Sequence, residues 1–251
     1  MVRLQQISKR FHIGTPTQVI ALQNIDLTIN KGQFVVIVGA NGSGKSTLLN
    51  TLAGNIPADQ GKIWIDQDEV GHLPVYKRTR WIARVFQNPL SGTASELSIL
   101  ANFRLASLRR ERKKMVLGIT DKFREEVAAN IQQLGMGLES KLDVPMGSLS
   151  GGQRQALTLL MAVMAKPALL LLDEPTAALD PHSARKLMEL ADRLICEHAL
   201  TAILVTHNLN EALRYGNRLI QMQSGQIVRD LDMEVKNSLN QAEILAWFDY
   251  F

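Results

Sequence analysis

Residues 39–46 combine glycine, lysine and serine in a spacing that could bind phosphate. They follow the apolar run Phe34–Val38 and read Gly39-Ala40-Asn41-Gly42-Ser43-Gly44-Lys45-Ser46. A strand that leads into a glycine-rich loop and then a helix can wrap its backbone N–H groups around nucleotide phosphates. Lys45 would then reach the β- and γ-phosphates, and the Ser46 hydroxyl would contact Mg²⁺. The alternative is a glycine-rich turn with a chance Lys-Ser pair, which the flanking strand and the helical pattern from Thr47 onward disfavour.

A pair of acids follows a second apolar run. The stretch Leu169–Leu172 ends in Asp173-Glu174-Pro175. Both carboxylates would therefore lie at the carboxyl end of a buried strand, where α/β sheets bind their ligands. Asp173 would hold Mg²⁺ through water, and Glu174 would polarise an attacking water. Two surface acids at a strand end are the alternative, which the phosphate-binding loop makes the weaker interpretation.

A third motif opens a helix. It reads Leu149-Ser150-Gly151-Gly152-Gln153 and leads into an apolar stretch. Ser150 is a good N-cap, and two glycines at a helix N-terminus expose backbone donors, so this start could bind an anion. One chain does not need a second anion site for its own nucleotide, so we expect this site to serve a partner subunit. An ordinary Ser-Gly-Gly helix start is the alternative.

The composition is typical of a globular protein. The 251 residues are 46% hydrophobic and 21% charged, with a net charge of +4, which suits an anionic membrane surface but equally an ordinary protein. The longest apolar stretches, Ala156–Ala165 and Ala168–Leu172, fall short of the ~20 residues that cross a bilayer, so we expect no transmembrane segment. The N-terminus lacks the pattern of a secretory signal. Cys196 is the only cysteine, which excludes an intrachain disulfide and favours the cytosol.

The periodicity of apolar residues predicts the elements that position these motifs. Alternation predicts antiparallel strands at the N-terminus, whereas continuous apolar runs further on predict buried parallel strands. Strands are expected over 2–8, 19–29, 34–38, 61–66, 169–172 and 201–205, and helices over 181–198 and 208–215. Strands that alternate with helices in this way indicate a doubly wound sheet.

A helical region interrupts this alternation. Residues from about 88 to 160 are rich in Leu, Glu, Lys and Arg, with helical spacing at Phe123, Val127, Ile131 and Leu134. We therefore expect a single domain, 1–251, with three parts. The core, with an antiparallel β subdomain, comprises 1–87 and 161–234; the helical subdomain comprises about 88–160; and a C-terminal helix comprises 235–251.

In this order and spacing, the three motifs resemble those of the ATPase subunit of ABC transporters. The resemblance covers essentially the whole chain, and the pentapeptide Leu149–Gln153 is highly specific to that superfamily. It implies an α/β fold: a P-loop ABC ATPase core with a parallel sheet, an antiparallel β subdomain and a helical subdomain. The stretch Arg154–Met161 resembles a branch of importer ATPases that work with a periplasmic binding protein and a permease.

The resemblance also implies roles for residues outside the three motifs. Phe11 would stack on adenine, with His12 as a substitute, although Phe11 could also be an edge-strand aromatic. Gln87 would contact Mg²⁺ and the attacking water, or be a loop residue only. His207 would touch the γ-phosphate. Asp180 would communicate across a dimer, and before Pro181 it is also suited to cap a helix.

The implied ligands are ATP and Mg²⁺. Catalysis is assigned to Lys45, Gln87, Glu174 and His207, and the metal to Ser46, Gln87 and Asp173. ATP binding in one subunit is assigned to Phe11, Gly39, Ala40, Asn41, Gly42, Ser43, Gly44, Lys45, Ser46 and Thr47. In trans it is assigned to Ser150, Gly151, Gly152 and Gln153.

The implied assembly is a head-to-tail homodimer that holds ATP between Gly39–Thr47 of one subunit and Ser150–Gly152 of the other. Integral membrane permease subunits would be direct partners and a solute-binding protein an indirect one, at the cytoplasmic face of the cell membrane. The basic run Arg109–Lys114 would contact lipid head groups or a permease loop, or be a solvated face.

The function implied is ATP hydrolysis that powers an ABC transporter, with import of a small solute such as an amino acid preferred. An ABC exporter is the close alternative. A soluble ABC ATPase that acts on nucleic acid or ribosomes is less favoured, because the span between Lys45 and Ser150 holds no sustained heptads, so we expect no nucleic-acid partner. A P-loop kinase would leave Leu149–Gln153 and Glu174 unexplained.

Overall fold

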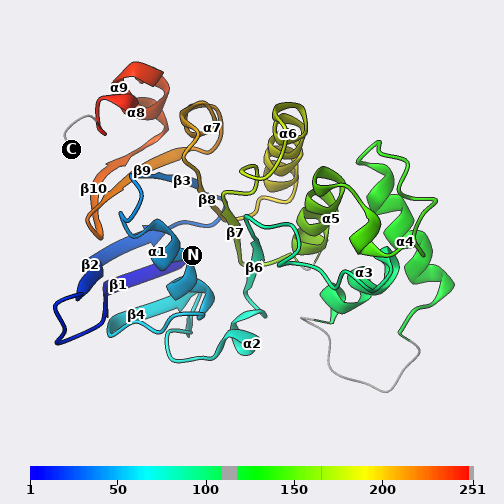
Figure 1. Cartoon of the computed structure of the whole chain (residues 1–251), viewed down its shortest axis with the longest axis horizontal. Coiled ribbons are helices and arrows are strands. Elements are labelled where there is room, and N and C mark those ends of the chain that lie inside the picture. The colour runs from blue at the N-terminus through cyan, green and yellow to red at the C-terminus, as the bar shows by residue number, and fades with distance from the viewer. Residues whose placement is uncertain (109–117, 165, 249–251) are drawn as a thin grey trace.

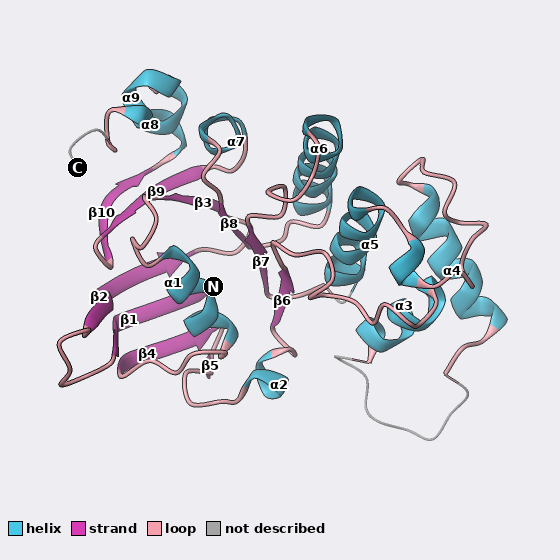
Figure 2. Ribbon diagram, viewed as in Figure 1, coloured by secondary structure: helices cyan, strands magenta, loops and turns pink. Residues whose placement is uncertain are grey.

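The computed structural model describes residues 1–108, 118–164 and 166–248, and a six-stranded sheet forms its centre (Figure 2). The strands are β3 Phe34–Val38, β6 Ile82–Val85, β7 Leu169–Asp173, β8 Ala202–Val205, β9 Arg218–Gln223 and β10 Gln226–Leu231. Their order is β10-β9-β3-β8-β7-β6. All neighbours are parallel except β10, which is antiparallel to β9. The two apolar runs 169–172 and 201–205 therefore form neighbouring parallel strands, as the sequence predicts.

A second, antiparallel sheet lies beside the first. It contains β1 Val2–Phe11, β2 Val19–Ile29, β4 Gln60–Ile65 and β5 Asp68–Glu69, in the order β2-β1-β4-β5. At the start of β1 the buried residues Val2 and Leu4 alternate with the exposed residues Arg3 and Gln5. This alternation is the signal from which the antiparallel strands are predicted, and the prediction is confirmed.

Helix α1 (Lys45–Ala53) lies between the two sheets (Figure 1). Its buried residues Leu48, Leu49 and Leu52 share one apolar cluster with strands of both sheets. The opposite face of the six-stranded sheet packs against helices in a second cluster. Strand β3 contributes to both clusters, with Val35 facing the first and Val36 facing the second, because successive side chains of a strand point to opposite faces.

Most of the other helices cover the second face and one end of the molecule. They are α3 Ile99–Ser107, α4 Asp121–Gln132, α5 Gly151–Met164, α6 Pro181–Glu197 and α7 Leu209–Arg214, with a 3₁₀ turn at Met146–Ser148. Helix α2 Val75–Arg78 lies on the other side, where Arg78 Nη1 donates to the carbonyl oxygens of Thr51 (2.7 Å) and Leu52 (2.9 Å) in α1. α3, α4 and α5 contact one another at the end opposite the C-terminus (Figure 1). The predicted helical spacing is confirmed in α4, where Val127 and Ile131 are buried. No described helix is long and apolar enough to span a bilayer.

The prediction of one C-terminal helix over 235–251 is wrong. Two short helices are present, α8 (Met233–Ser238) and α9 (Gln241–Leu245). Asn240 between them has extended backbone and forms a capping box with Glu243, and this starts a new helix instead of continuing the old one. The buried Lys236 ties α8 to the core, since its Nζ donates to the carbonyl oxygens of Gly216 (2.7 Å) and Tyr215. The basic run Arg109–Lys114 and residues 249–251 lie outside the described residues.

Candidate active site

The glycine-rich loop connects β3 to α1 through tightly packed backbone. Gly44 precedes the first residue of α1 and has a φ of 102°, in the left-handed region that favours glycine. A Cβ at Gly44 would lie 2.5 Å from the carbonyl oxygen of Ala21, and a Cβ at Gly39 would lie 2.4 Å from the carbonyl oxygen of Met222. The loop therefore fits against the neighbouring strands only because these positions carry no side chain.

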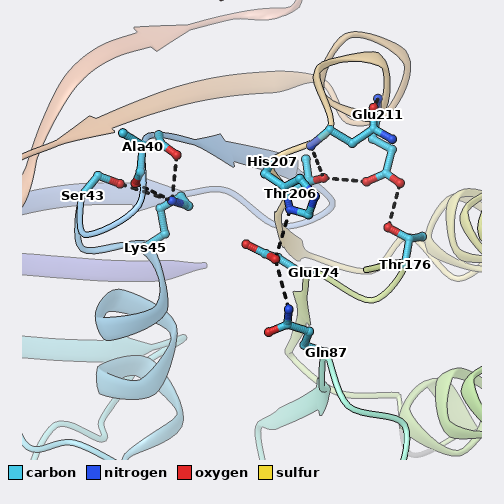
Figure 3. A network of polar contacts seen from close by, with 11 residues as sticks. Ala40, Ser43, Lys45, Gln87, Glu174, Thr176, Thr206, His207 and Glu211 are labelled. Atoms are coloured by element: carbon cyan, nitrogen blue, oxygen red, sulfur yellow. Dashed lines mark hydrogen bonds and ion pairs between the residues drawn. The ribbon is translucent and has the colours of Figure 1, made fainter. Parts of the chain in front are cut away.

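The lysine of the loop points back along it. The buried Lys45 donates through Nζ to the carbonyl oxygens of Gly39 (2.8 Å) and Ala40 (2.9 Å) and lies 3.4 Å from Ser43 Oγ (Figure 3). Burial lowers the pKa of Lys45, whereas the charges of Glu174 and Asp173 act to raise it. The loop thus holds an ammonium group where it could pair with the negative charge of a phosphate.

A cleft of about 360 Å³ runs along the loop from the end of β1. The residues predicted for the nucleotide that line it are Phe11, Asn41, Gly42, Gly44, Lys45, Ser46, Thr47 and Glu174. His12, the predicted substitute for Phe11, also lines the cleft. Gly39, Ala40 and Ser43 lie behind it and contact the Lys45 ammonium. The cleft therefore has an aromatic ring near one end and backbone donors with a cation near the other, which fits a nucleoside triphosphate.

Asp173 is the last residue of β7. The guanidinium of Arg84, which was not predicted from the sequence, holds its carboxylate in place. Arg84 of the neighbouring strand β6 forms an ion pair with Asp173 through Nη2. The Nη1 atom of Arg84 donates to Oδ1 of Asn50 in α1, at 2.7 Å. The guanidinium thus links the helix that follows the glycine-rich loop to the predicted metal ligand. Only the parallel pairing of β6 with β7 brings Arg84 there, and no local pattern in the sequence signals it.

Glu174, Gln87 and His207 meet beyond the strand ends (Figure 3). Oε2 of Glu174 lies 3.1 Å from His207 Nδ1 and accepts a hydrogen bond from Gln87 Nε2 at 3.4 Å. The Glu174 backbone has a φ of 44°, which is uncommon for a residue with a Cβ, and its N–H donates to the carbonyl oxygen of Val205 at 2.9 Å. The structure therefore brings together the three residues that the sequence assigns to water activation and γ-phosphate contact.

The buried side-chain amide of Gln155, also not predicted from the sequence, ties this group to α5. Gln155 is fully buried, and its Nε2 donates to the carbonyl oxygens of Phe86 (2.8 Å) and Pro175 (3.0 Å). Phe86 precedes Gln87 and Pro175 follows Glu174, so one side chain fixes the backbone on both sides of the Gln87–Glu174 contact. A glutamine in the first two turns of an apolar helix is the one sequence signal that could have marked it.

The Leu149–Gln153 motif lies elsewhere on the surface. Ser150 Oγ accepts from the N–H of Gln153 (3.3 Å), and Gln153 Oε1 accepts from the N–H of Ser150 (3.2 Å), so Ser150 caps α5 as predicted. Ser150 and Gly151 are exposed. Among the described residues that line the nucleotide cleft, none belongs to 150–153. Asp180 is likewise exposed and caps α6, with Oδ1 accepting from the N–H groups of His182 and Ser183. Hydrogen bonds from the side chain and then from the N–H group of Ser183 are the main causes that lower the pKa of Asp180.

The donors near Asp173 suit a hard divalent cation. Within 1–108, 118–164 and 166–248, no three His, Cys, Asp or Glu side chains gather as a ligand set of their own. The predicted metal residues Ser46, Gln87 and Asp173 offer a hydroxyl, an amide oxygen and a carboxylate. This is the oxygen chemistry that Mg²⁺ prefers when phosphates supply further ligands.

The fold and the cleft define a P-loop ATPase with an ABC-type signature helix. The model of the ABC transporter family matches residues 22–177, and the chain belongs to that family. It is the ATP-hydrolysing subunit of an ABC transporter. The resemblance drawn from the three sequence motifs is thereby confirmed.

Two curated relatives place the chain more closely. The tyrosine transport ATP-binding protein of Clostridioides difficile (strain R20291) is 40% identical over 256 residues, which cover 100% of this chain and 99% of that relative. An aliphatic sulfonates import ATP-binding protein of Agrobacterium fabrum (strain C58) is 34% identical over 215 residues, which cover 85% of this chain and 74% of that relative.

Solved structures agree with the fold. The ATP-binding cassette MJ0796, in a dimeric post-hydrolysis state bound to ADP and Pi, superposes with a TM-score of 0.79 at 30% identity and covers 93% of this chain and 99% of that one. The cbiO1 protein of Clostridium perfringens, part of the ABC transporter complex cbiONQ, gives a TM-score of 0.78 at 25% identity and covers 99% of this chain and 94% of that one. The predicted α/β cassette with an antiparallel β subdomain is confirmed.

Proposed function

We propose that this ATPase powers the import of a small solute, and specifically of an amino acid such as tyrosine. The observation that carries the proposal is the 40% identity, over the whole chain, to a tyrosine transport ATP-binding protein. A match over the full length includes the surfaces that meet other subunits, and it exceeds in identity and coverage the match to a sulfonate importer. Import instead of export is supported by this second relative, which is named as an import ATP-binding protein.

In the proposed site, ATP lies in the cleft with adenine on Phe11 and its phosphates along Gly39–Thr47. Lys45 exchanges its contacts with the loop carbonyls for contacts with the β- and γ-phosphates. The short distances from its Nζ to those carbonyls support this, because the ammonium already lies at the loop. His207 donates to the γ-phosphate and Glu174 accepts a proton from the attacking water. The contact between Glu174 and His207 places the two groups at one point.

Mg²⁺ would be held by Ser46, Gln87 and Asp173. When bound, the cation neutralises charge that develops on the β- and γ-phosphate oxygens. The Arg84 ion pair keeps the Asp173 carboxylate at the end of β7, and the Asn50 contact of the same guanidinium keeps it close to α1. The Asp173 carboxylate is therefore held at the strand end where the metal would lie.

We propose that a second copy completes the site through Ser150, Gly151, Gly152 and Gln153. The exposed start of α5 supports this, because Ser150 and Gly151 are exposed and lie outside the cleft of their own chain. The dimeric state of the solved cassette MJ0796 supports it further. ATP then stabilises the closed pair more than the open pair, and hydrolysis releases that difference in affinity. Asp180, on the loop between Glu174 and α6, would report closure to the second site.

Integral membrane permease subunits would receive this motion at the cytoplasmic face of the membrane, and a solute-binding protein would deliver the solute from the other side. Two findings support this assembly: the names of the transport relatives, and the similarity to cbiO1, which is described as part of the ABC transporter complex cbiONQ. The basic run Arg109–Lys114 remains a proposed contact with lipid head groups or a permease loop.

The test is reconstitution. The chain is co-expressed with candidate permease and solute-binding subunits, and the complex is placed in liposomes. We expect tyrosine, with its binding protein, to stimulate ATP hydrolysis and to accumulate on the side that carries the ATPase. A complex made with Glu174→Gln controls for ATP-driven uptake. Stimulation by an alkyl sulfonate and by no amino acid would overturn the substrate class, and movement of tyrosine away from the ATPase side would overturn import.

A further inference from the structure

A buried carboxylate lies close to the catalytic group and has no role in the steps above. Glu211, in the first turn of α7, is 7% exposed. Its Oε1 accepts a hydrogen bond from the Thr176 hydroxyl at 2.8 Å, and its Oε2 accepts one from the Thr206 hydroxyl at 2.6 Å (Figure 3). Both oxygens of one carboxylate therefore hold hydroxyl groups from two different loops.

The two threonines flank the catalytic residues. Thr176 lies two positions after Glu174, and Thr206 comes directly before His207. Each belongs to the segment that leaves the carboxyl end of a strand, β7 for Thr176 and β8 for Thr206. Glu211 thus joins the backbone that carries the proposed base to the backbone that carries the proposed phosphate contact.

The Thr206 hydroxyl has a fixed direction. It accepts a hydrogen bond from the N–H of Asn208 at 3.0 Å, so its proton is free to point at Glu211. Asn208 in turn caps α7, with Oδ1 accepting from the N–H of Asn210 at 3.0 Å. The helix cap, the hydroxyl and the carboxylate form one chain of hydrogen bonds, which holds α7 in register with His207.

Glu174 needs such restraint. Its positive φ of 44° costs free energy for a residue with a Cβ, and such a conformation persists only where the surroundings enforce it. Its N–H is held by Val205 and its carbonyl oxygen by the N–H of Ala177. The Thr176–Glu211 contact adds a side-chain restraint within the same turn.

A purely structural role would not explain why the buried position 211 carries a carboxylate instead of an apolar side chain. Taking a carboxylate out of water is costly, and an apolar side chain could fill the same space beside Ala212. The hydrogen bonds to both oxygens offset part of that cost, and they also fix the relative position of the two loops that they join. The fixed geometry is the 3.1 Å contact between Glu174 Oε2 and His207 Nδ1.

We propose that Glu211 is a positioning residue for ATP hydrolysis, which clamps Thr176 to Thr206 and so holds Glu174 and His207 at their working separation. The inference rests on the roles proposed above for these two residues. In this proposal Glu211 does not contact ATP, so loss of its hydrogen bonds should lower the rate of turnover without weakening ATP binding.

The decisive variants remove one hydroxyl at a time and keep the shape of the side chain. Thr176→Val and Thr206→Val are each expected to lower kcat about tenfold or more, with the Kd for ATP changed less than about twofold. Each variant removes a hydrogen bond that restrains a catalytic residue and leaves the residues of the nucleotide cleft in place. Thr206→Ser, which restores the hydroxyl, is expected to recover most of the lost kcat. Glu211→Ala should reproduce the larger of the two effects.

Controls separate the clamp from general damage. Glu189→Gln in α6 removes a half-exposed carboxylate that pairs at 3.1 Å with Arg214 of α7, the helix that carries Glu211, and we expect it to leave kcat unchanged. Full kcat in both valine variants would overturn the clamp. So would equal losses in Thr206→Ser and Thr206→Val, or a parallel loss of ATP binding.

A double variant tests the dependence on Glu174. Glu174→Gln combined with Thr176→Val should lose no more turnover than Glu174→Gln alone, since both act on one step. An additive loss would overturn the clamp while leaving the proposed function intact. Normal turnover by Glu174→Gln alone would instead overturn the catalytic role on which the clamp depends.

Discussion

Nδ1 of His207 lies 3.1 Å from Oε2 of Glu174, although the two residues are 33 positions apart. Neighbouring parallel strands cause this proximity: Asp173 at the end of β7 pairs with Val205 at the end of β8. Each functional residue lies just beyond its strand, so the sheet itself sets the distance between them. The pair forms where the carboxyl ends of strands meet the glycine-rich loop, which is the usual ligand-binding edge of such sheets.

Replacement of Glu174 by glutamine should stop turnover and leave nucleotide bound. The amide keeps the size of the side chain but cannot accept the proton of the attacking water, and a general base contributes roughly 10²–10⁴-fold. We expect ATP hydrolysis to fall by at least about 100-fold, with ATP affinity retained and a stable dimer in the presence of ATP. Single-turnover hydrolysis and size-exclusion chromatography check both parts. Wild-type turnover by this variant would remove Glu174 from its proposed role.

An arginine at Ser150 should separate ATP binding from hydrolysis. The side chain would occupy the exposed start of α5, which we propose to meet the nucleotide of the second copy. ATP affinity of the monomer should remain, whereas dimerisation with ATP and hydrolysis should be lost.

Ser150→Ala is the matched comparison, because it removes the helix cap without adding bulk. The lost cap should cost about 1 kcal/mol of stability, with only part of the activity affected. Normal ATP hydrolysis by Ser150→Arg would contradict the shared site.

Removal of the Phe11 ring should weaken binding of the base and leave binding of phosphate unaffected. Stacking between aromatic groups is worth about 0.5–1.5 kcal/mol beyond buried area, so Phe11→Ala should raise the Kd for ATP by several-fold to about tenfold. Calorimetric titration with inorganic triphosphate should give the same Kd for variant and wild type, and Phe11→Trp should bind ATP normally. An equal loss for ATP and for inorganic triphosphate would show that Phe11 acts on the loop and not on adenine.

The buried Lys236 should make stability depend on pH in the alkaline range. Burial lowers its pKa from 10.5 to about 8. Between these two values the unfolded chain holds more protons at this site than the folded chain, so the contribution of Lys236 to the free energy of unfolding rises with pH from about 8 to 10.5 and is constant below that window.

The difference in unfolding free energy between wild type and Lys236→Met isolates the contribution of Lys236 from those of the other titrating groups. We expect the difference to change in favour of wild type as pH increases from 8 to 10, in urea unfolding at fixed ionic strength. A pH-independent difference would show that the ammonium keeps its ordinary pKa against the carbonyls of Tyr215 and Gly216.

Local signals explain what the sequence predicts well. The turn from β3 into α1 depends on Gly44 and its neighbours, and the buried strand 169–172 on an unbroken apolar run. Both patterns lie within a few residues, so composition and spacing are sufficient to predict them. The charged side chains that support the catalytic group could not be predicted in this way. Arg84 and Glu211 act through contacts that span 89 and 35 positions, to Asp173 and Thr176, and no periodicity reveals such pairs.

The wrong prediction of a single C-terminal helix also arose because a specific side-chain contact decides the structure. Apolar residues over 235–251 favour a helix in outline, yet the capping box at Asn240 restarts the backbone within that segment. Strands β9 and β10 were likewise not predicted, since each depends on a neighbouring strand for its hydrogen bonds. Helix α2 was not predicted either, since it is only four residues long. A two-residue cap or a sheet neighbour overrides a weak periodic signal.

Strand β3 (Phe34–Val38) belongs to the apolar cores of both halves of the molecule, because its side chains alternate between the two faces of the sheet. Val35 and Ile37 complete the apolar cluster under the antiparallel sheet, while Val36 and Val38 complete the one under the helices. A fragment that kept either half would leave the other side of this strand in water. The whole chain is therefore expected to melt as one unit, and a cut on either side of the glycine-rich loop should yield aggregates instead of a working half.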